Sequence, residues 1–536
     1  MFFEKSKGIA NDFLQSVVFL DDKAFRNDSN DQYAFNAFEV SKAFAGEKKV
    51  CGIYNPASES DIECFKEIAR KSDVVILDWQ IEIPKSEKED NNADEDEDDP
   101  RGKYTKPIIN ELANTNSLKL IIVYTGEDVL DEITNDIFES VKEILPNRGD
   151  CEIYSDNIKV LVRYKSNNPD SDMEKFKSRT HLQDKIIPYN DLPSFVLNEF
   201  TKMTAGLLSN FALLSLTTVR NNSHKILSLF SKDLDAAYLA HKAVLPVQNH
   251  AEELLVKLFG DTVTDLLLYS EITKLFDTML SDWLSLKIKE KELPVLNKKG
   301  KKLNPPVLYK RNLNLLKLLL LSEEKDVEKR FKNQFKDLVQ HKEQREDYLE
   351  YLLKNSTALF EDEDNRRINI DKRFAILTHH KSLFLPSNIV PILTSGTIIK
   401  STANPNDYFV CIQQRCDSVR IKQGEERKFL FLPLTKVETG QFHFVTPEGT
   451  KLNLNKKSYS IKTIKFNCDN SNGEIKAFFD KSDKKYKFKE KYENGDTFEW
   501  IFDLKDLHSQ RIVADYALQL SRVGLDESEW LRKAGN

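Results

Sequence analysis

The sequence predicts a multidomain protein with an α/β N-terminal domain, a helical middle and a β-rich C-terminal domain. Apolar runs and helical patterns alternate over the first 170 residues, which is typical of a doubly wound parallel sheet. Helical spacing follows, and period-two alternation then dominates from about residue 370. The 536 residues suffice for about three domains. We place them at residues 1–175, 190–365 and 370–536.

Five continuous Val/Ile/Leu runs predict the strands of the N-terminal sheet. Strands that are buried on both faces read as such runs, and helices between them imply parallel crossovers. The five runs are SVVFLDD (16–22), KVCGIYN (49–55), DVVILDW (73–79), SLKLIIVYTG (117–126) and IKVLVRYK (158–165). We therefore expect a five-stranded parallel sheet.

The remaining two regions carry less specific patterns. In the middle region a basic segment, 293–306, predicts a solvated loop, with a basic contact patch as the alternative. The uncharged segment 203–219 is shorter than the roughly twenty apolar residues of a spanning helix, so we expect a buried helix there and no membrane contact. The C-terminal segments QFHFV, SYSIKTIKF, KKYKFKE and DTFEWIF predict strands of a barrel or sandwich, followed by a last helix.

Composition indicates a soluble globular chain. Hydrophobic residues make up 40% and charged residues 31%, and 79 Lys and Arg against 86 Asp and Glu give a net charge of −7. This mild acidity argues against a chain organised around nucleic acid. Nine of the thirteen residues from Glu87 to Asp99 are acidic, so an acidic insertion occupies residues 86–100. The six cysteines show neither zinc-ribbon nor CxxC spacing and no signal peptide is evident, which predicts reduced thiols in the cytoplasm.

Acidic and hydroxyl side chains stand where the predicted strands end. Asp21 and Asp22 follow the first strand, Asp78 follows the third and Thr125 ends the fourth. In an open α/β sheet, ligands bind at the carboxyl ends of the strands. Three converging carboxylates need a hard cation, and oxygen ligands favour Mg²⁺. Carboxylates more than about 8 Å apart could not share such an ion, whose bonds to oxygen are about 2.0–2.1 Å long.

The ordered acidic set resembles that of the receiver domain of bacterial two-component response regulators. The resemblance covers about a third of the chain and rests on Asp21-Asp22 after VVFL, Asp78 in DVVILDW and Thr125-Gly126 after LIIVY. It implies that Asp78 is the phosphoacceptor. Other roles are implied for residues around it: metal binding for Asp21, Asp22, Asp78 and the Gln80 backbone carbonyl, a switch hydroxyl for Thr125 and phosphate pairing for Lys165.

Three departures from the receiver pattern concern the expected output switch. Ser166 stands where the family usually has a proline after its lysine, and the aromatic residue expected before the lysine is absent at Val162. Tyr164, directly before Lys165, is the nearest aromatic residue. We expect it to lie on the wrong face of the strand to take the place of the missing aromatic. After Asp78, the usual proline is displaced to Pro84.

The long extension carries no Walker A, GxSxG, HExxH or GxGxxG motif. A divergent receiver with such an extension is similar to the receiver proteins of bacterial phage-defence phosphorelays, and within them to the non-effector receiver protein of the Detocs system. That resemblance implies a phosphoacceptor that is not an enzyme and acts as a phosphate sink. Its expected partners are a sensor histidine kinase and a receiver-bearing effector.

Two other functions remain open at this point. The first is a phosphorylation-independent pseudo-receiver that acts as an interaction protein. The second is an effector whose β-rich domain binds nucleic acid through the lysines between Lys451 and Lys491, with Tyr486 and Phe488 interleaved.

Overall fold

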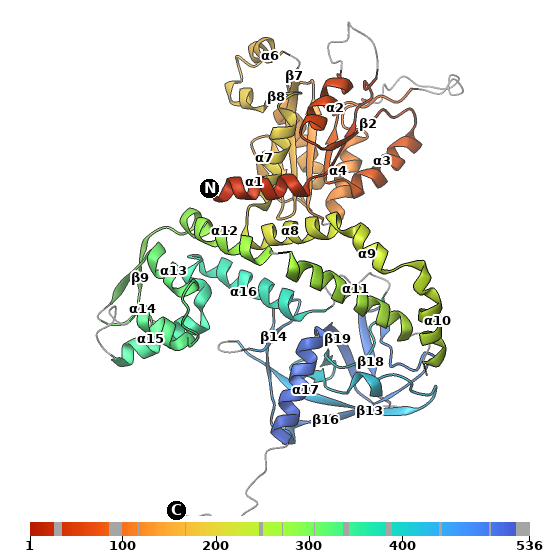
Figure 1. The fold of residues 1–536 in the computed structure, drawn as a ribbon, viewed down its shortest axis with the longest axis vertical. Helices are drawn as coiled ribbons and strands as arrows, with labels where there is room; N and C mark the ends of the chain where they lie inside the picture. Colours follow the sequence, from red (N-terminus) through yellow and green to blue (C-terminus); the bar gives the residue numbers. More distant parts are fainter. Residues whose placement is uncertain are drawn as a thin grey trace, which may run out of the picture. The chain divides into compact units, whose positions relative to one another are not determined.

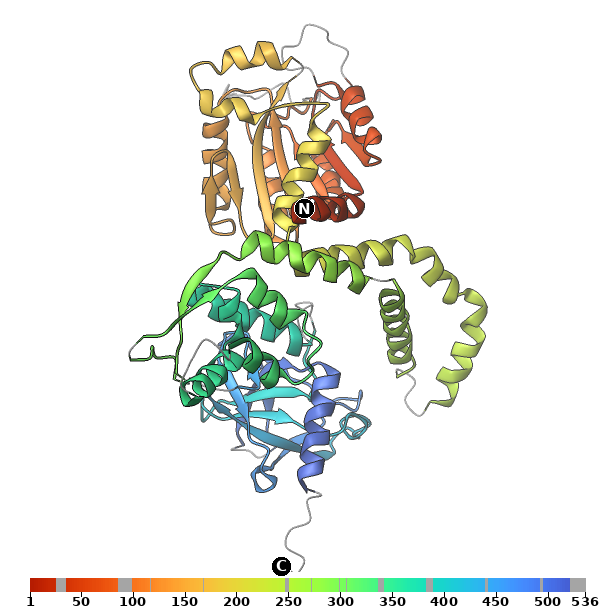
Figure 2. The ribbon, with the colours of Figure 1, turned by 60° about the vertical axis from the view of Figure 1, so that its left-hand side comes forward.

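The computed structural model divides the chain into two compact units, Met1–Lys289 and Glu290–Asn536 (Figures 1 and 2). The described residues are 1–25, 35–84, 99–115, 117–166, 168–245, 250–270, 272–297, 299–304, 306–335, 342–381, 389–438, 442–491 and 495–520. Most of the acidic insertion lies outside them. The division into three domains that the sequence suggests stays a prediction.

Unit 1 is built on an eight-stranded mixed sheet with the order β2-β1-β3-β4-β7-β6-β5, and β8 pairs with β7. The strands are β1 Ser16–Leu20, β2 Val50–Tyr54, β3 Val74–Leu77, β4 Lys119–Thr125, β5 Asn147–Gly149, β6 Glu152–Tyr154, β7 Ile158–Ser166 and β8 Ile186–Pro188. The five predicted strands are β1, β2, β3, β4 and β7, and all their mutual pairings are parallel.

The sheet is larger than the predicted five strands. Strand β6 of the β5–β6 hairpin pairs antiparallel with β7. Strand β8 pairs parallel with the carboxyl end of β7. Each of these additions is three residues long, too short to show a hydrophobic period in the sequence.

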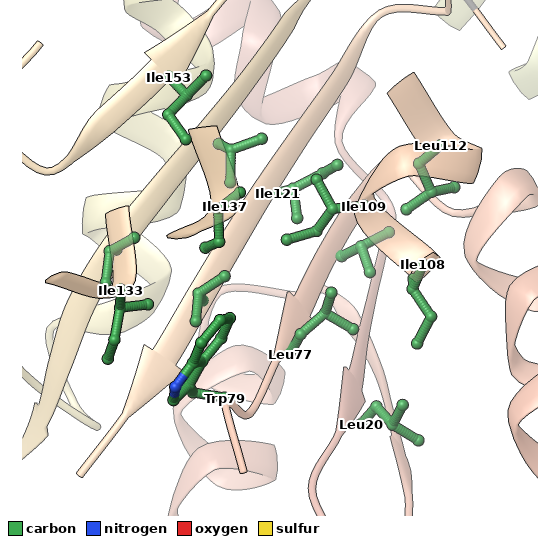
Figure 3. Close-up of a cluster of buried hydrophobic side chains, with 14 of the residues drawn as sticks. Leu20, Leu77, Trp79, Ile108, Ile109, Leu112, Ile121, Ile133, Ile137 and Ile153 are labelled. Carbon is green, nitrogen blue, oxygen red and sulfur yellow. The ribbon is translucent and has the colours of Figure 1, made fainter. Parts of the chain in front are cut away.

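Helices cover both faces of this sheet, which gives the three-layer arrangement expected of a doubly wound domain (Figure 1). One face packs against α3 Glu59–Lys71, α4 Thr105–Asn114 and α5 Leu130–Val141. Figure 3 shows isoleucines and leucines of this core together with Trp79. The opposite face packs against α1 Phe2–Phe13, α2 Ala37–Gly46 and α7 Leu192–Thr204.

Further helices extend unit 1 beyond the sheet: α6 Pro169–Lys175, α8 Leu207–Asn221, α9 Ser223–Leu229, α10 Asp235–Val244, α11 His250–Tyr269 and α12 Ile272–Lys287. The predicted buried helix at 203–219 is split between α7 and α8, and Leu208 and Leu216 on α8 are exposed. The prediction was wrong because only one stripe of α8, with Leu213 and Thr217, faces the core. Within the described residues, no helix is long and apolar enough to span a bilayer.

Unit 2 begins with a hairpin and helices and continues into an antiparallel sheet. The hairpin strands, β9 Lys291–Pro294 and β10 Leu308–Arg311, are joined by the basic segment that the sequence predicts as a loop. The helices are α13 Leu313–Leu320, α14 Val327–Phe335, α15 Lys342–Lys354 and α16 Asp364–His379.

The sheet of unit 2 has nine strands in the order β14-β15-β13-β12-β11-β19-β18-β17, with β16 paired to β13. They are β11 Thr397–Ser401, β12 Tyr408–Cys411, β13 Glu426–Lys436, β14 Phe444–Val445, β15 Lys451–Leu454, β16 Lys462–Asn467, β17 Phe478–Asp480, β18 Lys485–Lys489 and β19 Thr497–Asp503. The last described helix, α17 Asp506–Leu520, packs Ile512 and Tyr516 on one of two cores. The β-rich prediction is confirmed.

Candidate functional site

The strand order brings three carboxylates together at one edge of the unit 1 sheet. Strands β1 and β3 are neighbours, and the chain leaves β1 toward β2 on one side and returns to β3 on the other. Asp21 and Asp22 follow β1, and Asp78 follows β3. Carboxylate oxygens of the three residues lie within 4.8 Å of one another. The sheet topology therefore places all three acids at the point where ligands bind in such folds.

Lys165 reaches this cluster from the carboxyl end of β7. Its Nζ donates to Asp21 Oδ2 and to Asp78 Oδ2, both at 3.0 Å. The Lys165 side chain is 4% exposed and that of Asp78 is 5% exposed. The second oxygen of Asp78 accepts the backbone N–H of Trp79 at 2.9 Å. Each Asp78 oxygen therefore has a donor that fixes the orientation of the carboxyl group.

Burial and charge set the protonation of this group. Burial, together with the neighbouring carboxylates of Asp21 and Asp22, raises the pKa of Asp78 to about 7, against the lowering effect of the Lys165 ammonium. Burial by itself would lower the pKa of Lys165, but the carboxylates of Asp78 and Asp21 outweigh it and hold that pKa well above its ordinary value. The lysine is thus a permanent cation beside a carboxyl group that titrates near neutral pH.

A group of three aromatic residues that the sequence did not single out packs together, and one of them lies beside Lys165. The Lys165 Nζ lies 5.7 Å from the centroid of the Phe35 ring, and Phe35 packs edge-on against Tyr189, which follows β8. Tyr189 also contacts Tyr124 on β4, and the Tyr124 hydroxyl donates to the Ile187 carbonyl at 2.6 Å. The sequence does not predict the positions of these residues. Phe35 has the pattern of an ordinary core residue, and the position of Tyr189 depends on strand β8, which the sequence did not predict.

The loop that follows Asp78 is tied to the start of α4. The Thr105 hydroxyl donates to the Asp78 carbonyl at 2.6 Å. Gly102, with φ of 67°, lies against the Trp79 indole, where a Cβ would clash. Gln80 forms an isolated bridge with Arg101. The chain on the far side of the acidic insertion therefore returns directly to Asp78, and its contacts hold the backbone from Asp78 to Gln80.

The residues present fit a divalent cation. Carboxylate oxygens of three buried aspartates converge here, and a divalent cation would offset the repulsion among them. The donor atoms are all oxygens, which suits Mg²⁺. Thr125, at the end of β4, is buried and its Oγ1 accepts the Glu127 N–H at 3.1 Å. Gln80 stands two residues beyond Asp78, and metal binding through its carbonyl stays a prediction.

Comparison with known proteins identifies this part of the chain. Residues 13–170 match the family described as the response receiver domain, 158 of the 536 residues. Residues 13–170 form a divergent receiver domain. No curated protein and no solved structure matches the chain. Receiver domains are phosphoacceptors rather than enzymes in the usual sense, and they interact with histidine kinases and typically bind Mg²⁺ in an acidic pocket.

The receiver domain differs from its family pattern around β7. Val162 and Tyr164 belong to one buried core and therefore lie on the same face of β7. The prediction that Tyr164 lies on the wrong face was wrong. Tyr164 packs edge-on against Phe176 and accepts a hydrogen bond from Lys175. Ser166 donates to Asp172 Oδ2 at 2.6 Å. Local contacts with α6 therefore occupy these side chains.

In the β-rich unit, carboxylates accompany the lysines that suggested nucleic-acid binding. Lys485 pairs with Glu499 at 2.5 Å, and Lys487 pairs with Asp480 at 2.8 Å. Phe488 is 1% exposed within a core, so it offers no surface on which a base could stack.

Proposed function

We propose that the receiver domain accepts a phosphoryl group on Asp78 from the phosphohistidine of a partner kinase. The observation that carries this proposal is the pair of 3.0 Å bonds from Lys165 to Asp78 and Asp21 within a buried acidic cluster. A lysine held in this way can follow the phosphoryl oxygens once the aspartate becomes an acyl phosphate.

The transfer forms one bond and breaks one. A carboxylate oxygen of Asp78 attacks phosphorus, the bond between phosphorus and the imidazole nitrogen breaks, and its electron pair leaves with the imidazole, which takes up a proton from solvent. The Asp78 carboxyl must be ionised to attack, and the adjacent ammonium of Lys165 favours that state. The Thr125 hydroxyl can accept the Glu127 N–H and still donate its own proton toward the product.

Asp21, Asp22 and Asp78, with the backbone carbonyl of Gln80, would hold the Mg²⁺ ion. When bound, the ion neutralises negative charge on the transferred group. Lys165 and the Trp79 N–H meanwhile keep the Asp78 carboxyl group in a fixed orientation.

The finer role that we propose is that of a phosphate sink. The extension beyond the receiver domain carries no Walker A, GxSxG, HExxH or GxGxxG motif. Acceptance followed by slow hydrolysis would then remove phosphoryl groups from a kinase and from its receiver-bearing effector. The setting we propose is a bacterial anti-phage two-component system, on the resemblance to the Detocs receiver protein.

Labelling with a small phosphodonor tests the proposal. The full chain is incubated with acetyl phosphate and Mg²⁺, and phosphate incorporation is compared among the wild type, Asp78→Ala and Asp78→Asn. Asp136→Ala is the matched control, because Asp136 is a partly exposed carboxylate on α5 that pairs only with Lys106 among the contacts described.

We expect incorporation into the wild type and the control and none into either Asp78 variant. Equal labelling of all four proteins would overturn the proposal. So would a wild type that takes up no phosphate yet binds its partner kinase, since that result identifies a pseudo-receiver.

A further inference from the structure

A second cluster of metal-ligating side chains lies in unit 1, away from the acidic edge of the sheet. Asp131 is in the first turn of α5, Asp150 and Cys151 form the turn between β5 and β6, and His181 lies in the 3-10 helix η1, Thr180–Lys185. Ligand atoms of Asp131, Asp150 and Cys151 lie within 4.8 Å of one another. Three segments far apart in sequence thus bring sulfur, nitrogen and oxygen donors to one place.

Asp131 is the centre of the cluster. Its Oδ1 accepts from the Cys151 thiol at 3.5 Å, and its Oδ2 lies 3.2 Å from His181 Nε2. In a tetrahedral zinc site with bonds of about 2.0 Å to nitrogen or oxygen and about 2.3 Å to sulfur, neighbouring ligand atoms are about 3.3–3.5 Å apart. Cys151 Sγ and His181 Nε2 each lie at about such a separation from one oxygen of Asp131.

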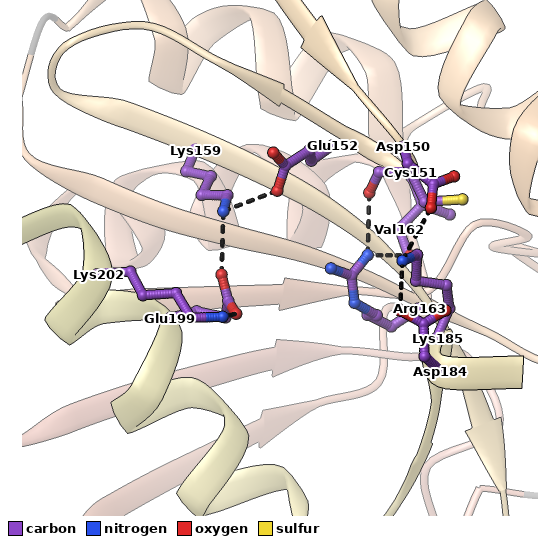
Figure 4. Close-up of polar contacts among 10 residues, drawn as sticks. All are labelled: Asp150, Cys151, Glu152, Lys159, Val162, Arg163, Asp184, Lys185, Glu199 and Lys202. Atoms are coloured by element: carbon purple, nitrogen blue, oxygen red, sulfur yellow. Dashed lines mark hydrogen bonds and ion pairs between the residues drawn. The ribbon is translucent and has the colours of Figure 1, made fainter. Parts of the chain in front are cut away.

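Burial and backbone contacts fix the sulfur. Cys151 is 1% exposed, whereas the His181 side chain is 57% exposed. The Cys151 carbonyl accepts from Arg163 Nη1 at 2.9 Å (Figure 4) and from the Val162 N–H at 3.0 Å. The thiol is thus a preorganised ligand on the buried side of the cluster. An ion could enter from solvent on the side of the exposed His181 imidazole.

Asp150 can join the same ion without leaving a cation stranded. Its Oδ2 now pairs with Lys185 at 2.9 Å, and Lys185 also pairs with Asp184 at 2.7 Å (Figure 4). If the Asp150 carboxylate binds a metal ion, Lys185 still has its ion pair with Asp184.

We propose that Asp131, Asp150, Cys151 and His181 form a structural zinc site. A site with one thiolate, one imidazole and carboxylate oxygens suits Zn²⁺ better than Mg²⁺, which takes oxygen ligands. The ion would fasten η1 to the β5–β6 hairpin and to α5, and η1 leads directly into β8. This site does not depend on phosphoryl transfer at Asp78.

Metal analysis of the full-length chain, without a histidine tag, tests the site. The protein is dialysed against micromolar Zn²⁺ and then against metal-free buffer, and its zinc content is measured, with affinity from competition against a chelator. The variants are Cys151→Ser and His181→Ala, the second at an exposed side chain whose loss leaves the core intact. Cys64→Ser, at an exposed cysteine, and Asp78→Ala are the controls.

We expect one zinc per chain in the wild type and both controls, and an affinity lower by about tenfold or more in Cys151→Ser and His181→Ala. With Co²⁺ in place of zinc, the charge-transfer absorption of a cobalt–thiolate bond should appear in the wild type and vanish in Cys151→Ser. A wild type that retains no zinc would overturn the site, as would equal retention by the two ligand variants. Loss of zinc from Asp78→Ala alone would assign the ion to the acidic cluster and also refute it.

Discussion

Lys165 is the residue on which the acidic cluster depends for its stability. Its ammonium is the one cation that donates to both Asp21 and Asp78 among the hydrogen bonds described. Removing one partner of a buried ion pair leaves an uncompensated charge in the interior. The free energy of unfolding then falls by more than the net contribution of the intact pair.

We therefore expect Lys165→Met to lower the free energy of unfolding by about 3–5 kcal/mol. Chemical denaturation of the full chain measures this. The double variant Lys165→Met/Asp78→Asn should recover part of the loss, because it removes one of the stranded carboxylates. Identical midpoints for the wild type and the single variant would contradict the buried ion pair.

Asp78 should give the protein a pH dependence near neutrality. Burial raises its pKa to about 7 in the folded state, against about 3.9 for an unfolded chain. Between these values the folded protein holds a proton that the unfolded chain has lost, so the contribution of Asp78 to stability falls as the pH rises from about 4 to about 7. The fraction of Asp78 that is ionised, and so able to act as a nucleophile, rises as the pH approaches and passes about 7.

Without added metal, we expect the stability of the wild type to decline relative to Asp78→Asn as the pH rises from about 4 to about 7. Denaturation at a series of pH values for both proteins measures the difference. A difference that stays constant across this range would show that Asp78 has an ordinary pKa. Lys165, Asp21 and Asp22 are the charged groups around it, and all three are retained in the comparison.

At the residue scale, the sequence predicted the side chains that follow apolar strands. Asp21, Asp22 and Asp78 could be found because each comes directly after a continuous apolar run. Phe35 and Tyr189 could not, since their place beside Lys165 comes from packing between distant segments. The same holds for the zinc ligands at 131, 150, 151 and 181, which have no spacing that a motif would show.

At the scale of elements, a chain of ion pairs fastens α7 to the sheet. Lys159 on β7 pairs with Glu199 on α7 at 3.0 Å and with Glu152 on β6 at 2.7 Å, and Lys202 pairs with Glu199 at 2.6 Å (Figure 4). The Glu199 side chain is 7% exposed, whereas that of Lys202 is 59% exposed. The inner pair should therefore matter more than the outer one.

We expect Glu199→Ala to destabilise the protein by about 1.5–3 kcal/mol, because it removes charged hydrogen bonds from a buried position. Lys202→Ala, the matched control on the same helix, should cost less than about 1 kcal/mol. Thermal denaturation of both variants compares them. Equal losses would mean that burial does not distinguish the two contacts.

The sequence was informative for elements long enough to show a period. Strands β1, β2, β3, β4 and β7 agree with their predicted runs within two residues at each end. The hairpin β5–β6 and strand β8 escaped prediction because three residues carry no period and their pairing is decided by β7. Helix α8 shows the opposite failure, since an uncharged sequence hid a helix with only one buried stripe.

At the scale of the whole molecule, the net charge is concentrated beside the proposed phosphorylation site. Residues 87–98 hold eight acids and one lysine, a charge of −7 that equals the charge of the entire chain. The remainder is neutral overall. Surface insertions of this length affect the stability of a fold little, so the acidic insertion need not contribute to the receiver chemistry.

We expect replacement of residues 87–98 by a short Gly/Ser linker to leave phosphate incorporation from acetyl phosphate within about twofold of the wild type, because long loops are tolerated. Initial labelling rates measure this. A fall of an order of magnitude or more would show that the insertion is part of the site. Acetyl phosphate is small, so the result is independent of any effect of the acidic charges on a protein partner.

The central claim is that Asp78 becomes an acyl phosphate. Borohydride reduces an aspartyl phosphate to homoserine, so treating the labelled protein and sequencing its peptides by mass spectrometry locates the modified residue directly. We expect homoserine at position 78 in the wild type, only when both the phosphodonor and Mg²⁺ are present. Homoserine at another aspartate, or an unmodified position 78 in protein that has taken up phosphate, would contradict the account.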